Sequence, residues 1–382
     1  MKRFLGIFLA IALMFSFASV GLAANEKGAD CGLKFNKDGK FTIIQFADMQ
    51  DDAFPRKAMT MLMEKALADI KPDLVVLSGD NVTTVNTKLE AKLAITNACA
   101  PIVRSGIPFT FVFGNHDAEH VAKEYQLSVY QKLKNCITYD PDPSLYGCAT
   151  HNLEVKNSAG NKTVFNIWLF DSNMYDEENG GYDYIHDDQL AWYKKTCEEL
   201  ANKNNGSVVP SIAFQHIIPK EIETLIDSKN LTIREGCGEG VVGEPPCPAT
   251  INNGQIETLL QKGDTLGIFV GHDHVNNYIV HYKDPTGKSI DFINTPGIGF
   301  QTYGNEGRGF RVITIDENDL TKYDTYTKTF FDYFGNDSTG KAMYDFFGSE
   351  VAVYLPNFLC DLIVYLLKTD IGQKIYNAFP KK

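Results

Sequence analysis

Five segments of the sequence each end in polar residues that could bind a metal ion. These endings are Asp48-Met-Gln50, Gly79-Asp80-Asn81, Gly114-Asn115-His116-Asp117, Gln215-His216 and Gly271-His272-Asp273-His274. A single cluster of this kind is usually a turn or a helix cap, but five in one chain favour a shared purpose. Carboxylates and imidazoles together suit Zn, Fe, Mn or Co. The candidate ligands exceed what one ion needs, so they predict two ions that share a carboxylate.

The elements between these clusters predict how the clusters meet. Apolar runs at 41–47, 74–77 and 109–113 are typical of buried strands. Apolar residues at helical spacing predict helices at 57–70 and 88–103, and a further helix follows the third strand. This β-α-β-α-β-α order indicates parallel strands, whose carboxyl ends lie at one edge of a sheet. Open α/β sheets bind their ligands at that edge.

The middle of the chain predicts a second sheet. Residues 151–155 and 164–170 are typical of a hairpin, and residues 187–201 of an amphipathic helix. Residues 235–254 are rich in Gly, Pro and Cys and predict a long loop. Further strands are expected at 211–214, 266–270, 278–282, 291–294 and 309–315.

Some residues could line the site or could serve only turns and packing. They are Asp171-Ser-Asn173, Tyr182, Tyr184 and His186. The glycines between Gly297 and Gly309 could let the backbone approach the metal ions, although a flexible connection explains them equally well.

The two ends of the chain are expected to differ from the rest. Lys2, Arg3 and the apolar run from Phe4 to Val20 predict a secretory signal at 1–23, with a transmembrane anchor as the alternative. A catalytic domain at 24–320 would then lie in a secreted or endomembrane-lumen protein. Residues 321–382 are expected to form a helical extension, because the apolar run near its end contains Asp361 and is too short to span a membrane. Helices packed on the body are favoured, with weak membrane contact as the alternative.

Charge argues against nucleic acid as a partner. The formal charge is −12 in the full chain, and it becomes −14 once the two positive charges of Lys2 and Arg3 are removed with the signal. A basic groove for nucleic acid is therefore not expected. Carboxylates are instead available for cations.

Cysteines and sequons predict chemical processing of an exported chain. Eight cysteines favour disulfides, with Cys136–Cys148 and Cys237–Cys247 as the preferred pairs. Glycosylation sequons begin at Asn161, Asn205, Asn230 and Asn336 and matter in a eukaryotic source. Asn81 also fits the pattern, but it follows a strand end and is expected to be inaccessible.

The ordered clusters make the sequence resemble the calcineurin-like metallophosphoesterase superfamily, and most closely its purple-acid-phosphatase-like branch. The resemblance covers about residues 41–316. It includes the segment from Ile268 to Tyr278 and the segment Arg308-Gly-Phe-Arg-Val312. It implies an α/β fold, a four-layer α/β/β/α sandwich of two mixed sheets. It also implies two divalent or trivalent metal ions, with Fe, Zn and Mn as candidates.

The resemblance implies a role for each matching residue. Asp80 would bridge the two ions, Asp48 and His274 would hold the first, and Asn115, His216 and His272 would hold the second. His116 would contact the substrate phosphate and protonate the leaving group, and Asp117 would orient His116. The implied reaction is acid-phosphatase-like hydrolysis of a phosphomonoester by a metal-activated water, with a phosphodiesterase as the runner-up.

Two positions depart from the family pattern. Most members have histidine where this chain has Gln50, and purple acid phosphatases have tyrosine where it has Thr83. Gln50 could bind through its amide oxygen, or a water could complete the shell. We therefore expect weak or altered metal binding at the first site. A non-catalytic secreted or surface protein is the alternative to an enzyme, and the sequence predicts no oligomeric state.

Overall fold

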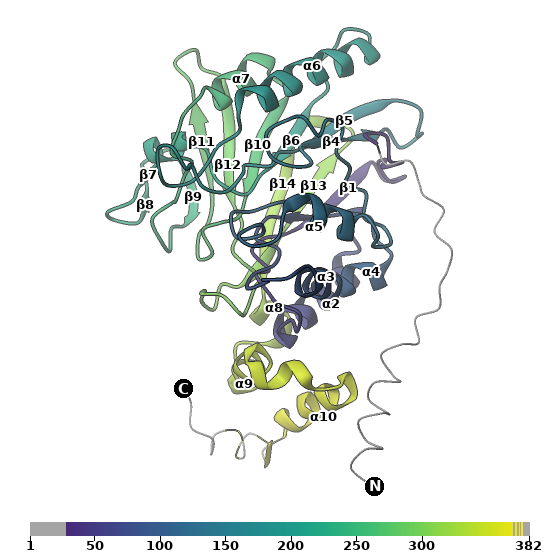
Figure 1. Cartoon of the computed structure of the whole chain (residues 1–382), viewed down its shortest axis with the longest axis vertical. Helices are drawn as coiled ribbons and strands as arrows, with labels where there is room; N and C mark the ends of the chain where they lie inside the picture. The colour runs from purple at the N-terminus through teal and green to yellow at the C-terminus, as the bar shows by residue number, and fades with distance from the viewer. Residues whose placement is uncertain (1–27, 370, 373, 375, 377–382) are drawn as a thin grey trace.

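The computed structural model describes residues 28–369, 371, 372, 374 and 376, and its framework is a pair of β-sheets (Figure 1). In the first sheet, β1 (Lys40–Phe46), β2 (Leu74–Ser78) and β3 (Phe109–Val112) are parallel neighbours. β13 (Gly309–Asp316) and β14 (Asp319–Thr329) continue the sheet on the other side of β1 as antiparallel strands. The parallel part confirms the predicted β-α-β-α-β order.

The second sheet has the strand order β4-β5-β6-β10-β12-β11-β9. Its centre is parallel and consists of β5 (Thr163–Leu169), β6 (Ser211–Phe214), β10 (Thr265–Val270) and β12 (Ser289–Asn294). Antiparallel strands flank it, namely β4 (His151–Lys156), β11 (Asn277–Lys283) and β9 (Gly238–Val241). A short helix, η1 (Lys220–Thr224), precedes a ribbon of β7 (Ile226–Asp227) and β8 (Thr232–Ile233).

Helices cover the outer faces of both sheets (Figure 1). One apolar core joins the first sheet to α2 (Lys57–Ile70), α3 (Lys88–Ala98), α4 (Ala100–Ser105) and α5 (Lys123–Tyr130). A second core joins the other sheet to α6 (Asp187–Lys203) and α7 (Gln255–Lys262). A third core, which includes Phe41, Leu153 and Phe214, lies between the sheets. Three cores between four layers confirm the predicted α/β/β/α sandwich.

A buried polar seam also joins the two sheets. Gln45 of β1 donates to the hydroxyl of Ser78 (2.9 Å) and to the carbonyl of Val270 in β10 (3.1 Å), and it accepts from Thr295 (2.6 Å). Arg311 of β13 donates to the same Thr295 hydroxyl (3.0 Å). Buried polar groups cost free energy unless they are hydrogen-bonded, so this inter-sheet seam favours one register of the two sheets.

Some elements differ from the prediction. The helix expected at 88–103 is divided at Cys99, because Pro101 has no backbone N–H to continue α3 and instead lies in the first turn of α4. The strand expected at 309–315 joins the first sheet beside β1, not the second sheet. The loop expected at 235–254 contains the edge strand β9. β14 has no counterpart among the predicted strands, because polar side chains dominate its sequence.

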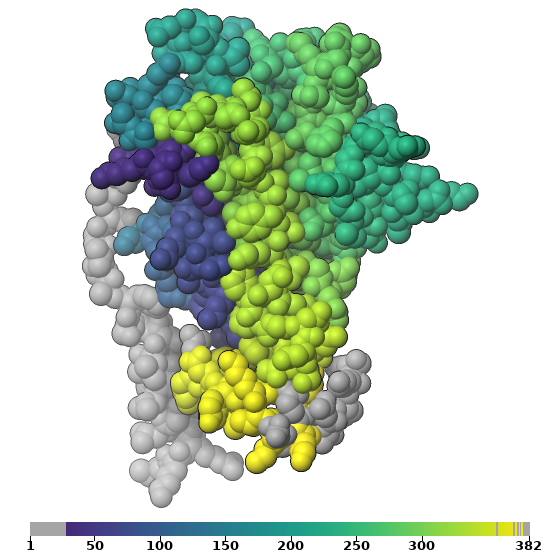
Figure 2. Space-filling model, turned by 180° about the vertical axis from the view of Figure 1, so that it is seen from behind, coloured from purple at the N-terminus to yellow at the C-terminus, as the bar shows by residue number. Residues whose placement is uncertain are grey.

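The predicted boundary of the C-terminal extension at residue 320 is wrong, because residues 321–329 belong to β14 of the first sheet. The extension, which begins after β14, packs on the body of the protein, as expected. It consists of α8 (Phe330–Phe334), α9 (Ser338–Gly348), η2 (Glu350–Tyr354) and α10 (Asn357–Leu367), and it lies at one end of the molecule (Figure 2). Met343 and Phe347 of α9 are buried in the same core as Met59 of α2. Among the described residues, every helix falls short of the length and apolarity needed to cross a bilayer. Weak membrane contact of the extension stays a prediction.

The preferred disulfide pairs are wrong, because Cys148, Cys237 and Cys247 are free cysteines. Cys237 lies beside His281 of β11, whereas Cys247 lies beside Asp273, which precedes β11. The N–H of His281 donates to the Cys237 carbonyl (2.7 Å), whereas the N–H of Cys247 donates to Asp273 (3.2 Å). The two cysteines therefore contact different residues, and strand β9 lies between them in the chain.

The other predictions about processing have different outcomes. The predicted signal segment, residues 1–23, lies outside the described residues. Asn81 is buried, and its amide donates to the carbonyl of Val112 (2.9 Å), which confirms that this sequon is inaccessible. Glycosylation at the remaining sequons stays a prediction.

Acid should weaken the fold through His151. This histidine is buried between the sheets, with Nε2 2.8 Å from the Thr110 hydroxyl and Nδ1 2.6 Å from the Ala149 carbonyl, and burial lowers its pKa to about 4. A histidine in the unfolded chain has a pKa of about 6.5. Between pH 4 and pH 6.5, His151 is therefore neutral in the folded protein and takes up a proton when the protein unfolds. The stability contributed by neutral His151 is therefore present above pH 6.5 and lost as the pH falls to 4, by about 3 kcal/mol. Urea unfolding of the metal-free protein across this range measures the loss.

A His151→Gln variant is the matched control for this prediction. It lacks the titrating imidazole, so its free energy of unfolding should fall less steeply between pH 6.5 and 4. Parallel pH profiles for the wild type and the variant would contradict the assignment to His151.

Candidate metal centre

The loops that follow β1 and β2 lie side by side at the carboxyl edge of the first sheet. The N–H of Gln50 donates to the carbonyl of Asp80 (2.8 Å), and the N–H of Asp48 donates to that of Gly79 (3.2 Å). Asp48, Asp80 and His272 have left-handed backbones, with φ of 51°, 49° and 72°. Residues other than glycine rarely adopt this conformation, and the surrounding structure must stabilise it. Such backbone strain is typical of functional sites.

Two groups of buried side chains could each hold a metal ion. Within each group, the ligand atoms all lie within 4.8 Å of one another. Cluster 1 is Asp48, Asp80 and His274, and cluster 2 is Asp80, His216 and His272. Asp80 belongs to both clusters, as a carboxylate shared by two ions would. Atoms bound to one ion at about 2.1 Å lie roughly 3 to 4 Å apart, so both donor sets fit an ion after small adjustments.

In cluster 2, His216 directs its Nε2 atom at Asp80. Its Nδ1 donates to the Ser78 carbonyl (3.0 Å), which leaves Nε2 3.3 Å from Asp80 Oδ2 and 3.2 Å from Asn115 Oδ1. Burial lowers the pKa of His216, but the neighbouring carboxylates outweigh burial and raise it to about 9. Burial lowers the pKa of His272 to about 3. His216 would therefore release a proton on binding a metal, whereas His272 is already a neutral imidazole.

In cluster 1, Tyr303 fixes the orientation of His274. The Nδ1 atom of His274 donates to the Tyr303 carbonyl (3.1 Å), and the two rings stack with centroids 4.1 Å apart. Nε2 therefore faces Asp48 Oδ1 at 3.5 Å. Burial lowers the pKa of His274 to about 4, so its imidazole is neutral and available to a cation.

Gln50 directs its amide nitrogen, not its oxygen, at cluster 1. The Nε2 atom donates to Asp80 Oδ2 at 2.8 Å, and the side chain is buried. Thr83, the other departure from the family pattern, bonds through its backbone N–H to the Asp51 carbonyl (3.2 Å). In the described part of the chain, cluster 1 thus offers two carboxylates and one imidazole as ligands, and Gln50 contributes a hydrogen bond to the shared carboxylate.

His116 lies at the open side of the centre. Its backbone N–H donates to Asp80 Oδ1 (2.8 Å), and its Nδ1 is 2.8 Å from Glu119 Oε1. The side chain is 38% exposed, so Nε2 is accessible to a substrate. Glu119 is absent from the sequence-predicted residues, although its position three residues after His116 could have suggested it.

The predicted contact between Asp117 and His116 is wrong, because the Asp117 carboxylate bonds to backbone groups. It accepts the N–H of Gly114 (2.7 Å), Asn81 (2.9 Å) and Val82 (3.0 Å). Burial and the charge of Asp80 raise the pKa of Asp117 to about 7. Asp117 therefore ties the loop that follows β3 to the loop that follows β2.

Tyr182 contacts cluster 2 directly, and Tyr175 bonds to the neighbouring Asn115. The Tyr175 hydroxyl accepts a hydrogen bond from Asn115 Nδ2 (3.1 Å) and donates one to Glu119 (3.2 Å). Tyr182 packs edge-on against His272, with ring centroids 4.3 Å apart, as expected for a lining residue. Tyr175 escaped prediction because no motif marks it in its loop.

The other candidate lining residues serve different purposes. Asp171 pairs with the ammonium of Lys123 (2.8 Å), and Tyr184 stacks on His186 (4.4 Å). The glycine-rich segment does approach the centre, because the N–H of Gly299 donates to the Asp48 carbonyl (3.0 Å). A Cβ atom on Gly299 would lie 2.3 Å from the Met49 carbonyl oxygen, so this close approach requires glycine.

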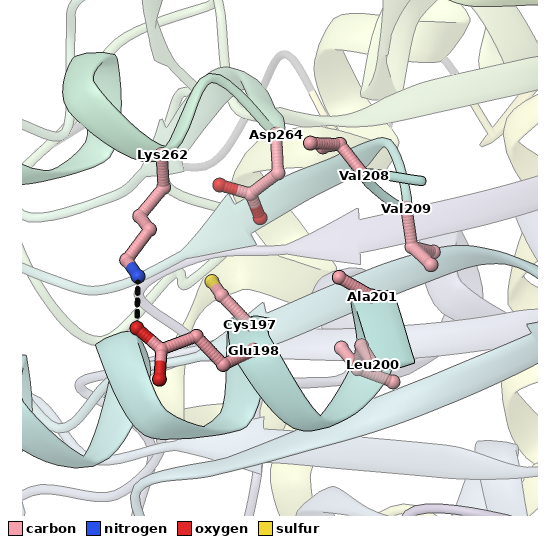
Figure 3. A pocket seen from close by; sticks show the side chains of 8 residues that line it. All are labelled: Cys197, Glu198, Leu200, Ala201, Val208, Val209, Lys262 and Asp264. Carbon is pink, nitrogen blue, oxygen red and sulfur yellow. Dashed lines mark hydrogen bonds and ion pairs between the residues drawn. The ribbon is translucent and has the colours of Figure 1, made fainter. Parts of the chain in front are cut away.

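A surface pocket of about 190 Å³ lies away from the centre, between α6 and the segments before β6 and β10 (Figure 3). It is lined by Cys197, Glu198, Leu200, Ala201, Val208, Val209, Lys262 and Asp264. Lys262 pairs with Glu198 (2.8 Å), and Asp264 accepts from Trp168 (2.8 Å). Because its charged groups have partners within the protein, we assign the pocket to packing.

Comparison with known proteins relates the chain to one family of phosphoesterases. The profile of the calcineurin-like phosphoesterase family matches residues 41–276. "Probable inactive purple acid phosphatase 29" of Arabidopsis thaliana is 31% identical over 76% of this chain and 80% of its own. "Probable inactive purple acid phosphatase 14" of the same plant is 30% identical over 74% of this chain and 77% of its own. A solved structure of a dimetal phosphatase from Danio rerio is 15% identical over 75% of this chain and 98% of its own, with a TM-score of 0.49.

Removal of the Asp117 carboxylate should destabilise the protein. Asp117→Ala leaves three buried N–H groups without an acceptor, so the free energy of unfolding should fall by about 3 kcal/mol. Urea unfolding of the metal-free protein measures it. Asp117→Asn is the control, because its amide oxygen can still accept two of these bonds and its loss should be smaller. A wild-type unfolding midpoint in Asp117→Ala would contradict this role.

Replacement of Gln50 should change the binding of one ion and not the other. Gln50→His adds an imidazole donor beside Asp80, and we expect about tenfold tighter binding in cluster 1. The affinity is measured by calorimetric titration of metal-free protein with Zn²⁺ or Mn²⁺. The metal content after purification gives the occupancy of the two sites. Gln50→Ala is the control that loses the hydrogen bond and gains no ligand. If cluster 1 is fully occupied by metal in both the wild type and Gln50→His, the hypothesis of weak binding at this site is wrong.

Proposed function

The chain belongs to the calcineurin-like phosphoesterase family, and we propose that it hydrolyses phosphomonoesters at a dinuclear centre formed by clusters 1 and 2. The observation that carries the proposal is the sharing of Asp80 between two buried donor sets. Two ions of Fe, Zn or Mn suit these carboxylate and imidazole donors. When bound, such ions stabilise negative charge on the phosphoryl group and lower the pKa of a water.

His116 is the group best placed to act on the leaving group. Asp80 holds its backbone and Glu119 holds its Nδ1 atom, so Nε2 faces outward beside the shared carboxylate. A proton on Nε2 can pass to the departing alkoxide, which makes His116 the proposed general acid. Glu119, in place of Asp117, is then the residue that orients it.

One observation favours a second candidate, a binding protein without turnover. Gln50 gives Asp80 a hydrogen bond where a ligand was expected. The two Arabidopsis relatives carry the words "probable inactive" in their names. Against this candidate, both clusters and His116 are intact, and hydrolysis therefore remains the favoured function.

Export of the protein is part of the proposal. Lys2, Arg3 and the apolar residues 4–20 support a signal that directs the chain to the exterior or to an endomembrane lumen. The acidic chain fits a small phosphate ester better than a nucleic acid, because its net charge repels polyanions.

Loss of the His116 imidazole should slow hydrolysis without removing the metal ions. His116→Ala should lower kcat on p-nitrophenyl phosphate by about 10²- to 10⁴-fold, because the leaving group loses its proton donor. Phosphate release is measured in the presence of Mn, Zn, Fe or Mg, with and without a chelator. The metal content of each protein sample is determined in parallel. His120→Ala, an exposed histidine on the same loop, is the matched control and should keep wild-type kcat.

The same assay separates the alternatives. Faster hydrolysis of bis(p-nitrophenyl) phosphate than of the monoester would indicate a phosphodiesterase. No hydrolysis of either ester by wild-type protein that holds both ions would contradict the proposed activity and favour the non-catalytic candidate.

A further inference from the structure

We propose that the C-terminal extension positions cluster 1 of the metal centre, and that Arg308 and Tyr344 are the positioning residues. The inference rests on the proposed dinuclear function and adds to it a role for a part of the chain that supplies no ligand. Two loops connect the extension to cluster 1. One is the loop at 297–308, which contacts His274, and the other is the segment after β1, which carries Asp48.

Arg308 holds the loop at 297–308 around its guanidinium group. Its Nε donates to the carbonyl of Gly299 (2.6 Å), and its Nη2 donates to that of Thr302 (2.8 Å). Only 9% of Arg308 is exposed. A Cβ atom on Gly304 would come within 2.8 Å of the guanidinium carbon, so the loop closes tightly over it. One buried side chain therefore fixes two carbonyls of this loop, those of Gly299 and Thr302.

Helix α9 of the extension supplies a partner for Arg308. Arg308 Nη1 donates to the Tyr344 hydroxyl, which in turn donates to the carbonyl of Asn305 (2.7 Å). The ring of Phe300 lies 5.0 Å from the guanidinium and 4.8 Å from the Tyr344 ring. A Cβ atom on Gly348 would lie 2.7 Å from the Phe300 ring, so α9 and the loop are in close contact.

The same loop orients the imidazole of cluster 1. Tyr303, next to the Thr302 carbonyl that Arg308 holds, accepts the Nδ1–H of His274 (3.1 Å) and stacks on its ring. This bond selects the tautomer that leaves Nε2 free to face Asp48. Partners of this kind commonly tune a metal site from outside its ligand set.

A second contact connects the extension to the segment after β1. Tyr354 of η2 packs on Phe54, with ring centroids 5.3 Å apart, and Glu350 lies 3.5 Å from Arg56. The N–H of Arg56 also donates to Asp51, the neighbour of Gln50 (2.8 Å). This second contact lies at the surface and contributes little, because the Glu350 side chain is 86% exposed and Phe54 and Tyr354 are 52% and 72% exposed. The contact through Arg308 and Tyr344 is therefore the main link.

Cluster 2 is held by other parts of the protein. His216 bonds to the Ser78 carbonyl of β2, and His272 packs against Tyr182 from the loop before α6. The extension should therefore influence the two clusters unequally. Weakening its contacts with the loop at 297–308 should lower the affinity for one ion and spare the other.

Metal titrations of the full chain test this asymmetry. Mn²⁺ or Zn²⁺ is added to metal-free wild type, Tyr344→Phe and Arg308→Lys, and binding is followed by calorimetry. One of the two binding events should weaken about threefold to tenfold in Tyr344→Phe and up to about 100-fold in Arg308→Lys. The other event should stay unchanged. Tyr333→Phe is the matched control, because this tyrosine also belongs to the extension but its hydroxyl bonds to Asp69 (2.9 Å).

Histidine NMR adds a readout that needs no metal. In metal-free protein labelled with ¹⁵N at histidine, His274 should carry its proton on Nδ1 in the wild type and in Tyr333→Phe. Arg308→Lys should give a mixture of tautomers. Circular dichroism and thermal unfolding check that each variant is folded.

The outcomes separate this inference from the proposed function. Unchanged affinities and an unchanged His274 tautomer in folded Tyr344→Phe and Arg308→Lys would overturn the positioning role. Wild-type protein that binds fewer than two ions would count against the dinuclear function, while the tautomer comparison would still decide the inference.

Discussion

The buried negative charge of Asp80 is the constraint on which the rest of the structure depends. Burial alone would raise its pKa, yet His216 and His116 hold the pKa below its ordinary value. A buried charge costs several kcal/mol unless it is paired, and here it is paired with His216 and hydrogen-bonded to Gln50 and the His116 backbone. These partners follow β1, β3 and β6. The centre therefore forms only where the carboxyl edges of both sheets meet.

The candidate ligands could be predicted because the order of strands and helices determines which chain segments lie next to one another. Parallel strands separated by helices bring their carboxyl ends to one edge, so polar residues after β1, β2 and β3 must be neighbours. Residue type at a strand end is visible in a sequence. That is why Asp48 and Asp80, which lie apart along the chain, could be assigned to one site before their distances were known. His274 follows β10 of the other sheet, and the family resemblance assigned it to the same site.

The direction in which each side chain points could not be predicted in the same way. The Gln50 amide faces Asp80 with its nitrogen from a backbone with φ of 36°, and the Asp117 carboxylate bonds to three N–H groups across two loops. Both depend on loop torsions that residue types do not encode. β13 shows the same limit for the fold, because its apolar residues suit either sheet and only tertiary packing selects a place beside β1.

The inter-sheet seam restricts how this protein can move. Gln45 and Arg311 are buried, and their bonds to Val270 and Thr295 cross from one sheet to the other. Sliding the sheets would break these bonds together, at about 1–3 kcal/mol for each group left unpaired. Closure of one half of the molecule on the other is therefore disfavoured. Ligand entry and departure would instead be timed by the surface loop that carries Tyr175, since loop motions belong to the nanosecond to microsecond range.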